Sequence, residues 1–297
     1  MTEEAGLEIR TLGEADLAAA MKLKESAGWN QTEADWLRLL RLEPGGCFAA
    51  TAGGRLVGTA TTTAYGRELA WVGMVLVDPE FRRRGIASLL MGAALSYLDG
   101  RGVETVKLDA TPDGRHVYER LGFETESLVE RWHCRGVGEA RAGQPDAGSR
   151  KGGASRPVFD DARLAEVVEL DRAAFGADRS RLVRLLAEES NGTFVRTGSD
   201  GRALAYALAR EGAVADYVGP VVAPDLETAA SILDEALARL ASRPVYIDVN
   251  TQFELSTRAL AERGFGKQRE LIRMRRGAKS GAGTSPRVFA IAGPEVG

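Results

Sequence analysis

The chain has 297 residues, of which 44% are hydrophobic and 27% charged, an ordinary balance for one large or two average globular domains. The net charge of −3 argues against a nucleic-acid binder, and the absence of any run of 18 apolar residues argues against a membrane span. The N-terminal residues lack the pattern of a secretory signal, and Cys47 and Cys134 form no disulfide framework, so a cytoplasmic protein is expected. With only His116 and His133 and no zinc-type spacing, no metal site is predicted.

The first half of the chain predicts alternating helices and strands. Gly53-Gly54 is a hairpin signal between two strands, and the apolar run 70–77 is typical of a strand buried on both faces that ends before Pro79. Thr32 is a suitable N-cap for the helix that follows it. The predicted strands are 7–10, 47–52, 56–65, 70–77, 103–110 and 124–134, and the predicted helices are 14–27, 32–42, 86–98 and 114–121.

Three arginines, Arg82, Arg83 and Arg84, stand between the apolar strand and the helix after it. Cations are unfavourable at a helix N-terminus, which already carries partial positive charge, so this turn needs a compensating anion. Exposed N–H groups at a helix start bind phosphate, and Gly85 lets the backbone approach such a ligand closely. The simpler alternative is a solvated helix start.

Residues 135–157 lack apolar periodicity and are rich in Gly, Ala, Arg and Ser, which predicts a linker. After it the order of elements repeats. The second half predicts helices at 161–175, 180–189 and 228–240, and strands at 193–197, 203–210, 213–222 and 245–249. The stretch 259–265 is similar to 117–123, so the chain is expected to hold two related domains.

The unit of strand, basic turn and helix resembles the acetyl-CoA site of the GNAT superfamily of N-acetyltransferases. Arg82-x-x-Gly85-x-Ala87 matches the family signature Gln/Arg-x-x-Gly-x-Gly/Ala, and Tyr118-x-x-x-Gly122-Phe123 matches a second family element. The resemblance implies an α/β (α+β) fold of two tandem GNAT-like domains, each with a mixed, mostly antiparallel central sheet flanked by helices. It assigns 1–137 to a catalytic domain, 138–156 to the linker and 157–297 to a degenerate domain.

The second domain is called degenerate because its site residues differ. Aligning Pro224 on Pro79 puts Glu227 at the place of Arg82, Ala230 at that of Gly85 and Leu260 at that of Tyr118. A glutamate at a helix start would repel phosphate. The second half is therefore expected to lack a CoA site.

The resemblance also assigns residues to the cofactor. Backbone groups of Val75, Leu76 and Val77 would hold the pantetheine arm, and Tyr118 would protonate the leaving thiolate, unless it is only a packed core aromatic. Relatives often carry an asparagine that contacts pantetheine where this chain has 112–115, so that contact is not expected. The pyrophosphate would lie on the turn, whose assigned residues are Arg82, Arg83, Arg84, Gly85, Ile86, Ala87 and Ser88.

The general base and the acceptor site are less determined. Asp109 stands where some relatives carry a catalytic glutamate, although a hydrogen-bonded strand residue is the alternative, and Glu68 is a second candidate. Trp29 and Asn30 would wall the acceptor site, or serve only helix packing. Asp216 and Asp248 would face an acceptor if the second half contributes to the site.

The expected function is transfer of an acetyl group from acetyl-CoA to a primary amine of an unidentified small molecule or peptide, without a metal, by direct attack in a ternary complex. The alternative is a non-catalytic CoA-binding sensor or scaffold. Formation of a homodimer is left open.

Overall fold

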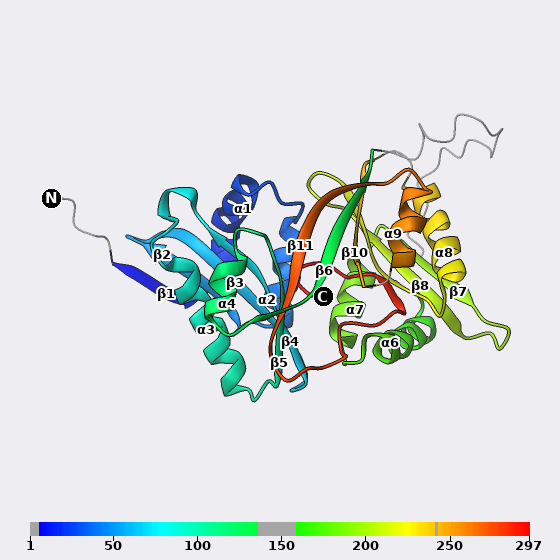
Figure 1. Cartoon of the computed structure of the whole chain (residues 1–297), viewed down its shortest axis with the longest axis horizontal. Coiled ribbons are helices and arrows are strands. Elements are labelled where there is room, and N and C mark those ends of the chain that lie inside the picture. Colours follow the sequence, from blue (N-terminus) through cyan, green and yellow to red (C-terminus); the bar gives the residue numbers. More distant parts are fainter. Residues whose placement is uncertain (1–5, 136–158, 241–242, 253) are drawn as a thin grey trace. The chain divides into compact units, whose positions relative to one another are not determined.

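A computed structural model describes residues 6–135, 159–240, 243–252 and 254–297 (Figure 1). The chain divides into two compact units. Unit 1 comprises Met1–Ser127, Leu271–Gly283 and Pro294–Gly297, and unit 2 comprises Leu128–Glu270 and Thr284–Gly293. Each unit therefore includes segments from both halves of the sequence. The linker expected at 138–156 lies outside the described residues, and the domain boundaries at 137 and 157 stay a prediction.

Unit 1 contains a mixed sheet in the order β1-β2-β3-β4-β5-β11, antiparallel throughout except for the parallel pair β4–β5. Asp35 stabilises the start of α2, because its carboxylate accepts the backbone N–H of Thr32 at 2.7 Å. The strands are β1 (Leu7–Thr11), β2 (Cys47–Ala52), β3 (Arg55–Tyr65), β4 (Leu69–Val77), β5 (Thr105–Ala110) and, from Leu271 on, β11 (Gly266–Gly277). The helices are η1 (Glu14–Asp16), α1 (Leu17–Ser26), α2 (Glu33–Leu42), η2 (Pro79–Phe81), α3 (Ile86–Gly100) and α4 (Arg115–Arg120).

Helix α3 is held on the sheet by one apolar face. Its buried residues recur at spacings of three and four, as expected for a helix with one side in the core. They are Ile86, Leu90, Met91, Ala94, Leu95 and Leu98, and they pack against Val57, Ala60, Val72, Val106, Leu108 and Met274. Because this face is fixed, the N-terminus of α3 is fixed at the carboxyl end of β4.

Strands β4 and β5 are in register only at their beginnings. Their parallel ladder joins Ala70 to Val106 and Trp71 to Lys107 and goes no further. Met74 then adopts a left-handed backbone conformation (φ 49°), next to a register shift between Thr59 and Thr61 of β3. Such a bulge bends a strand away from its neighbour. A wedge therefore opens between the carboxyl ends of β4 and β5.

Unit 2 has a related sheet in the order β6-β10-β9-β8-β7, with β12 paired to β9. Helix α8 covers it with Ile232, Ala236 and Leu237, which pack in the core with Val221 and Ile247. The strands are, from Leu128 on, β6 (Glu124–Cys134), then β7 (Gly192–Thr197), β8 (Ala203–Arg210), β9 (Asp216–Val222), β10 (Val245–Asn250) and β12 (Val288–Ala290). The helices are α6 (Asp161–Phe175), α7 (Ser180–Glu189), α8 (Leu226–Arg239) and α9 (Glu254–Ala261).

The two halves of the sequence exchange their last long strands. Residues Ile272–Gly277 of β11 pair with β5 in unit 1, and Val129–Cys134 of β6 pair with β10 in unit 2. The strand at 124–134 was expected to complete the first domain, but from Leu128 on it belongs to unit 2. The strand that replaces it, β11, was not predicted.

Each exchanged strand carries an arginine that binds a buried aspartate. Arg273 contacts both carboxylate oxygens of Asp109 (2.8 and 2.9 Å), and Arg131 contacts both of Asp248 (2.8 and 2.6 Å). The exposed fraction is 0% for Asp109, Arg273 and Asp248 and 3% for Arg131. Two-point ion pairs of this kind fix the strand register.

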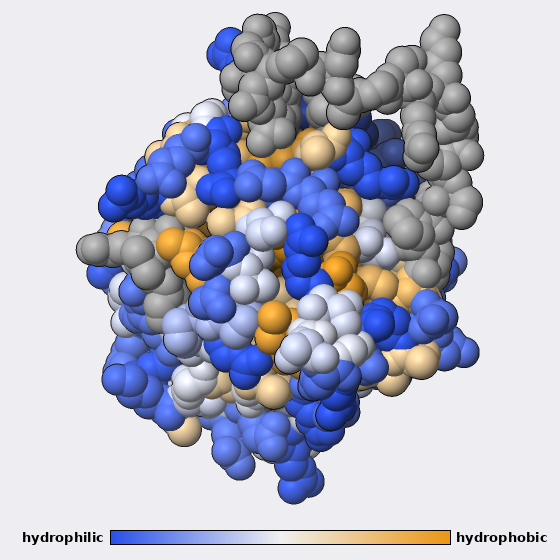
Figure 2. All heavy atoms as spheres, turned by 90° about the vertical axis from the view of Figure 1, so that its right-hand side faces the viewer, coloured by the Kyte–Doolittle hydropathy of each residue, from blue (hydrophilic) through white to orange (hydrophobic). Residues whose placement is uncertain are grey.

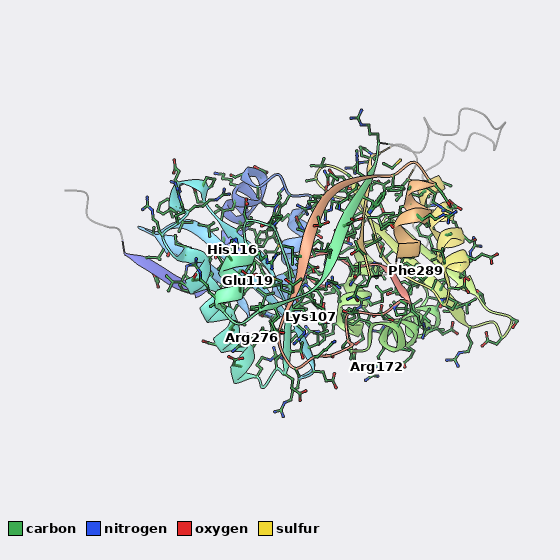
Figure 3. All side chains as sticks on the ribbon, viewed as in Figure 1. Lys107, His116, Glu119, Arg172, Arg276 and Phe289 are labelled. Atoms are coloured by element: carbon green, nitrogen blue, oxygen red, sulfur yellow. The ribbon has the colours of Figure 1, made fainter. Side chains whose placement is uncertain are left out.

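The segment after β11 returns to the sheet of unit 1. Lys107 of β5 (Figure 3), which is fully buried, donates to the backbone oxygen of Ala282 at 2.8 Å and pairs with Glu126 at 2.8 Å. Burial lowers the pKa of this lysine below its ordinary value. Unit 1 therefore depends on residues close to the C-terminal end of the sequence.

The face of the molecule turned to the viewer in Figure 2 is mainly hydrophilic where described side chains cover it, and its apolar side chains form small separate spots. None of the helices in the described ranges has the length and apolar character needed to cross a membrane.

Candidate active site

A cleft of about 1330 Å³ opens in unit 1 where β4 and β5 diverge. Its walls come from the end of α1, the end of β4, the turn before α3, and α4 with the loop before it. The residues that line it are Ser26, Ala27, Trp29, Val75, Leu76, Val77, Pro79, Glu80, Phe81, Arg82, Arg83, Arg84, Gly85, Ile86, Ala87, Ser88, Thr111, Asp113, Gly114, Val117, Tyr118 and Arg120. The cleft thus brings together every residue that the sequence assigned to acetyl-CoA.

The turn before α3 presents open backbone at the helix N-terminus. Arg83 and Gly85 have left-handed backbone conformations (φ 62° and 78°), and Gly85 is the N-cap. A Cβ at Gly85 would meet no atom within 4 Å, so the space beside the turn is free. The first N–H groups of a helix have no acceptor within the helix. These features fit a pyrophosphate group, which needs several converging N–H donors.

The arginines around this turn leave it positively charged. Arg82 donates to the backbone oxygen of Val77 (3.3 Å) and Arg84 to that of Glu80 (3.2 Å), so both bind uncharged carbonyl groups in these contacts. The nearby carboxylates of Asp78 and Glu80 are paired with Arg55 instead, at 2.6 and 3.2 Å. The turn is therefore suited to an anionic ligand.

The position of Tyr118 is compatible with both roles that the sequence left open. Its side chain is 9% exposed, belongs to the core beside Phe123, and also lines the cleft. Burial raises the pKa of its phenol to about 12, so the hydroxyl keeps its proton throughout the neutral range. The phenol can therefore act as a proton donor inside the cleft.

Neither of the two candidate bases lies in the cleft. The side chain of Asp109 is completely buried in its ion pair with Arg273, which leaves the carboxylate no access to a substrate. Glu68 is exposed in the turn that precedes β4, at the opposite end of that strand from Val75. The sequence-based assignment of Asp109 as the base is therefore replaced by a role in strand pairing.

Of the four residues predicted to bind the acceptor, one lines the cleft. Trp29 lines the cleft, whereas Asn30 is buried next to it and does not. In unit 2, Asp248 is bound by Arg131, and Asp216 pairs with Arg243 at 3.0 Å. Burial raises the pKa of Asp216, an effect that Arg243 partly offsets. Both carboxylates are engaged within unit 2, so we do not carry their predicted acceptor role further.

The wedge in unit 2 that corresponds to the cleft is largely filled by the chain itself. Strands β9 and β10 pair in parallel at Asp216–Val245 and Tyr217–Tyr246, and the ladder then ends as it does in unit 1. Strand β12 pairs with the end of β9, and the N–H of Ile291 donates to the backbone oxygen of Asp248 in β10 at 3.0 Å. Phe289 (Figure 3) packs against the apolar core there. The apolar cavity that remains there has a volume of about 30 Å³ and is lined in part by Val221, Ile247 and Phe289, so it is far smaller than the cleft of unit 1.

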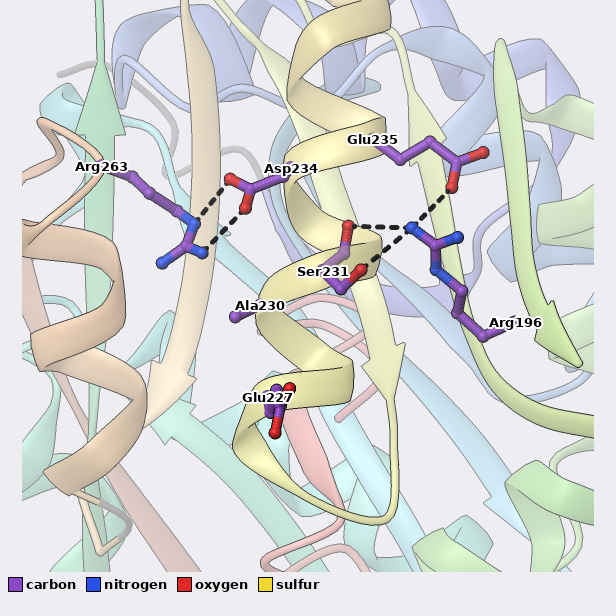
Figure 4. A pocket seen from close by; sticks show the side chains of 7 residues that line it. All are labelled: Arg196, Glu227, Ala230, Ser231, Asp234, Glu235 and Arg263. Carbon is purple, nitrogen blue, oxygen red and sulfur yellow. Dashed lines mark hydrogen bonds and ion pairs between the residues drawn. The ribbon is translucent and has the colours of Figure 1, made fainter. Parts of the chain in front are cut away.

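The turn before α8 is also unlike the one before α3. Residues 223–225 connect β9 to α8, whereas residues 78–85 connect β4 to α3, so most of the phosphate-binding turn is missing. Asp225 caps α8 by accepting the N–H of Thr228 at 2.8 Å. The alignment of Pro224 on Pro79 without a gap was therefore wrong in register. Glu227 lies in the first turn of α8 (Figure 4).

Three polar side chains along α8 are paired with arginines from outside the helix. Asp234 pairs with Arg263, while Ser231 and Glu235 bind Arg196 (Figure 4). The charges on this face of unit 2 are therefore compensated locally, unlike those of the turn before α3. Across the described residues, no group of three or more His, Cys, Asp or Glu side chains is placed to hold a metal ion.

Comparison with known proteins agrees with this geometry. Residues 15–123 match the Acetyltransferase (GNAT) family, and residues 167–290 match an Acetyltransferase (GNAT) domain. The chain belongs to the GNAT superfamily of N-acetyltransferases. An uncharacterised N-acetyltransferase of Bacillus subtilis, YitH, is 28% identical to it over 89% of both chains. The resemblance seen in Arg82–Ala87 and Tyr118–Phe123 is thus confirmed.

Solved structures support the two-domain GNAT fold. A putative acetyltransferase from Pyrococcus horikoshii has a TM-score of 0.79 and 21% identity, over 98% of this chain and 96% of that one. A tandem GNAT protein from the clavulanic acid biosynthesis pathway has a TM-score of 0.64 and 16% identity, over 93% of this chain and 99% of that one. The predicted fold class is confirmed.

Proposed function

We propose that unit 1 binds acetyl-CoA in its cleft and transfers the acetyl group to a primary amine by direct attack in a ternary complex. The observation that carries this proposal is the wedge between β4 and β5, which has the open turn of Arg82–Ser88 at one end and Tyr118 beside it. The family uses acetyl-CoA in general, and the residues around the cleft fit that substrate. Holding a thioester next to an amine is largely a task of positioning.

The chemical steps follow from the groups in the cleft. The amine nitrogen forms a bond to the acetyl carbon, the carbon–sulfur bond breaks, and the thiolate takes a proton from Tyr118. The nitrogen of the neutral amine loses one proton and keeps the other, and a proton returns to the Tyr118 oxygen, so the products are an N-substituted acetamide and free CoA thiol. Backbone groups at Val75–Val77 would hold the pantetheine arm during this reaction.

The test is thiol release. The full chain with acetyl-CoA is mixed in turn with a panel of primary amines, and free thiol is measured against a control without protein. Thiol release that requires both protein and amine supports the enzyme. Binding of acetyl-CoA without amine-dependent release for any member would instead support the alternative, a CoA-binding sensor or scaffold.

The filled wedge of unit 2 gives a prediction for stoichiometry. We expect one molecule of acetyl-CoA to bind per chain, because β12 occupies the corresponding place in unit 2, where the parallel strands β9 and β10 diverge. Calorimetry on the full chain measures the number of sites. Two sites of similar affinity would contradict the assignment of unit 2 as a domain without a CoA site.

The phosphate turn gives a second prediction, at Gly85. In Gly85→Asp a side chain and a negative charge enter the free space beside the N-terminus of α3, and the left-handed backbone is strained. We expect the Kd for acetyl-CoA to rise at least about 30-fold, or roughly 2 kcal/mol. Gly102→Asp is the matched control, since Gly102 has a similar conformation (φ 70°) beyond the other end of α3. Equal Kd values for the two variants would refute the location of the phosphate site.

A further inference from the structure

One carboxylate in the wall of the cleft is not engaged by any other described residue. Among the described residues that line the cleft, only Glu80 and Asp113 are acidic. The carboxylate of Glu80 is paired with Arg55 at 3.2 Å. Asp113 is exposed, and its carboxylate makes no hydrogen bond or ion pair with a residue in the described part of the chain. Its charge is therefore open to a molecule that enters the cleft.

The backbone that carries Asp113 is fixed by a closed turn between β5 and α4. The N–H of Gly114 donates to the backbone oxygen of Thr111 at 3.0 Å and to its hydroxyl at 3.2 Å. The N–H of Arg115 donates to the same backbone oxygen at 3.2 Å. Thr111, Asp113 and Gly114 all line the cleft. The turn thus holds the carboxylate at one wall of the cleft before a ligand arrives.

Asp113 is close to the phenol that would protonate the thiolate. A Cβ on Gly114 would lie 3.2 Å from Cε2 of Tyr118, so the ring of Tyr118 lies against Gly114. Since consecutive Cα atoms are about 3.8 Å apart, the Cα of Asp113 lies within roughly 9 Å of this ring. One proton donor and one proton acceptor therefore share a wall of the cleft.

The ordinary role of an aspartate before a helix does not account for Asp113. Such a residue commonly accepts an N–H of the first turn. Helix α4 has Gly114 as its N-cap instead, without a hydrogen bond from a side chain. The nearby cations of α4 have another partner, because Arg115 and His116 both contact Glu119, at 2.6 and 3.2 Å (Figure 3).

The other charged groups of the cleft favour anions. Arg82, Arg83 and Arg84 lie in the turn before α3, and Arg120 is the last residue of α4. The phosphate groups of acetyl-CoA would be partners for these arginines. A primary amine titrates at about pH 10, so it enters as an ammonium cation at neutral pH and needs a negative partner. Of the described carboxylates in the cleft, Asp113 is the one that is not already paired.

We propose that Asp113 binds the ammonium group of the acceptor and removes its first proton. This inference rests on the proposed function. The proton passes from the nitrogen to the Asp113 carboxylate, directly or through one water molecule, and the neutral amine then attacks the thioester carbon. Tyr118 protonates the leaving thiolate, and the second proton of the nitrogen returns through water to the Tyr118 oxygen. Asp113, which is exposed, releases its proton to solvent.

The test compares Asp113→Asn with the unmodified chain, using whichever of ethanolamine, putrescine and lysine amide gives the fastest thiol release. Asparagine keeps the size of the side chain and removes its charge and basicity. We expect kcat/KM for that amine to fall at least about 100-fold, while the Kd for acetyl-CoA changes less than about twofold. Glu119→Gln, which alters a carboxylate of α4 that does not line the cleft, is the matched control and should keep both values.

The pH profile and an uncharged nucleophile separate proton removal from a structural role. Without the base only the free amine reacts, so kcat/KM of Asp113→Asn should rise with pH up to about pH 10, whereas kcat/KM of the unmodified chain should level off earlier. Hydroxylamine is uncharged at neutral pH and needs no proton removed before it attacks. Asp113→Asn should therefore release thiol with hydroxylamine as fast as the unmodified chain does. Asp113→Glu keeps a carboxylate and should restore most of the rate with amines.

Unchanged amine kinetics in Asp113→Asn, or an equal loss of rate with amines and with hydroxylamine, would overturn the proposal while leaving the proposed function intact. If the unmodified chain releases no thiol with any of these nucleophiles, the proposed function fails. Calorimetry of putrescine added to the complex with CoA then decides whether Asp113 binds ammonium. Weaker binding to Asp113→Asn than to the unmodified chain supports this site, and equal binding or none excludes it.

Discussion

Replacing Tyr118 with phenylalanine should lower kcat at least about 100-fold, the lower end of the usual contribution of a positioned general acid. The ring remains, so its packing beside Phe123 and the shape of the cleft are preserved. Only the hydroxyl that would protonate the thiolate is lost. The Kd for acetyl-CoA should therefore change little, and steady-state thiol release together with calorimetry measures both quantities.

The control for this substitution is Tyr97→Phe in α3. The hydroxyl of Tyr97 donates to Glu43 at 2.6 Å, away from the residues that line the cleft, so its removal should leave kcat unchanged. The phenol of Tyr118 stays protonated up to about pH 12, so Tyr118 should cause no loss of rate between pH 6 and 9. A Tyr118→Phe variant with full kcat would restrict this residue to core packing.

A chain that ends at Arg135 should fail to form a stable unit 1. It lacks Arg273, so Asp109 would be left as a buried charge without its partner, a loss of roughly 3–5 kcal/mol. It also lacks Met274, whose fully buried side chain contributes roughly 2–5 kcal/mol. The sum is comparable to the whole stability of a domain, about 5–15 kcal/mol. Urea titration followed by circular dichroism, together with binding of acetyl-CoA, tests this expectation.

The matched experiment supplies the missing strand from a second chain. Fragments 1–135 and 157–297 are produced together, so that each contributes the strand that the other lacks. We expect them to copurify and to bind one acetyl-CoA per pair, whereas 1–135 alone should not bind it. A stable fragment 1–135 with the affinity of the full chain would mean that the exchanged strand is dispensable.

The sequence predicted most of the elements that build the cleft, for physical reasons that act locally. Apolar periodicity defined β4 and α3, and the charge anomaly at Arg82–Arg84 located the turn between them. Helix α4 was expected from 114 to 121 and occupies Arg115–Arg120. These features depend on residues within one turn or one strand of each other, so a reader of the sequence can detect them.

What the sequence did not predict depends on contacts between distant residues. The partner of Asp109 is Arg273, which lies 164 positions further along the chain. Glu295 accepts a hydrogen bond from Gln31, which is 264 positions away, and no local pattern links the two. The apolar residues Leu271, Ile272 and Met274 could have indicated a short strand, but not the sheet to which β11 belongs. β12 has only three residues, which is too short for a periodic signal.

The exchange of strands bears on how such a gene can change. After a duplication, one copy is usually free to disappear once the other carries the activity. Here a stop codon in the second half would remove Leu271–Gly277 from the sheet of the first, so the loss of the second copy would also be the loss of the first. The fold of the second half and the arginine at position 273 are thus needed for the sheet of the first half, whatever the second half does by itself.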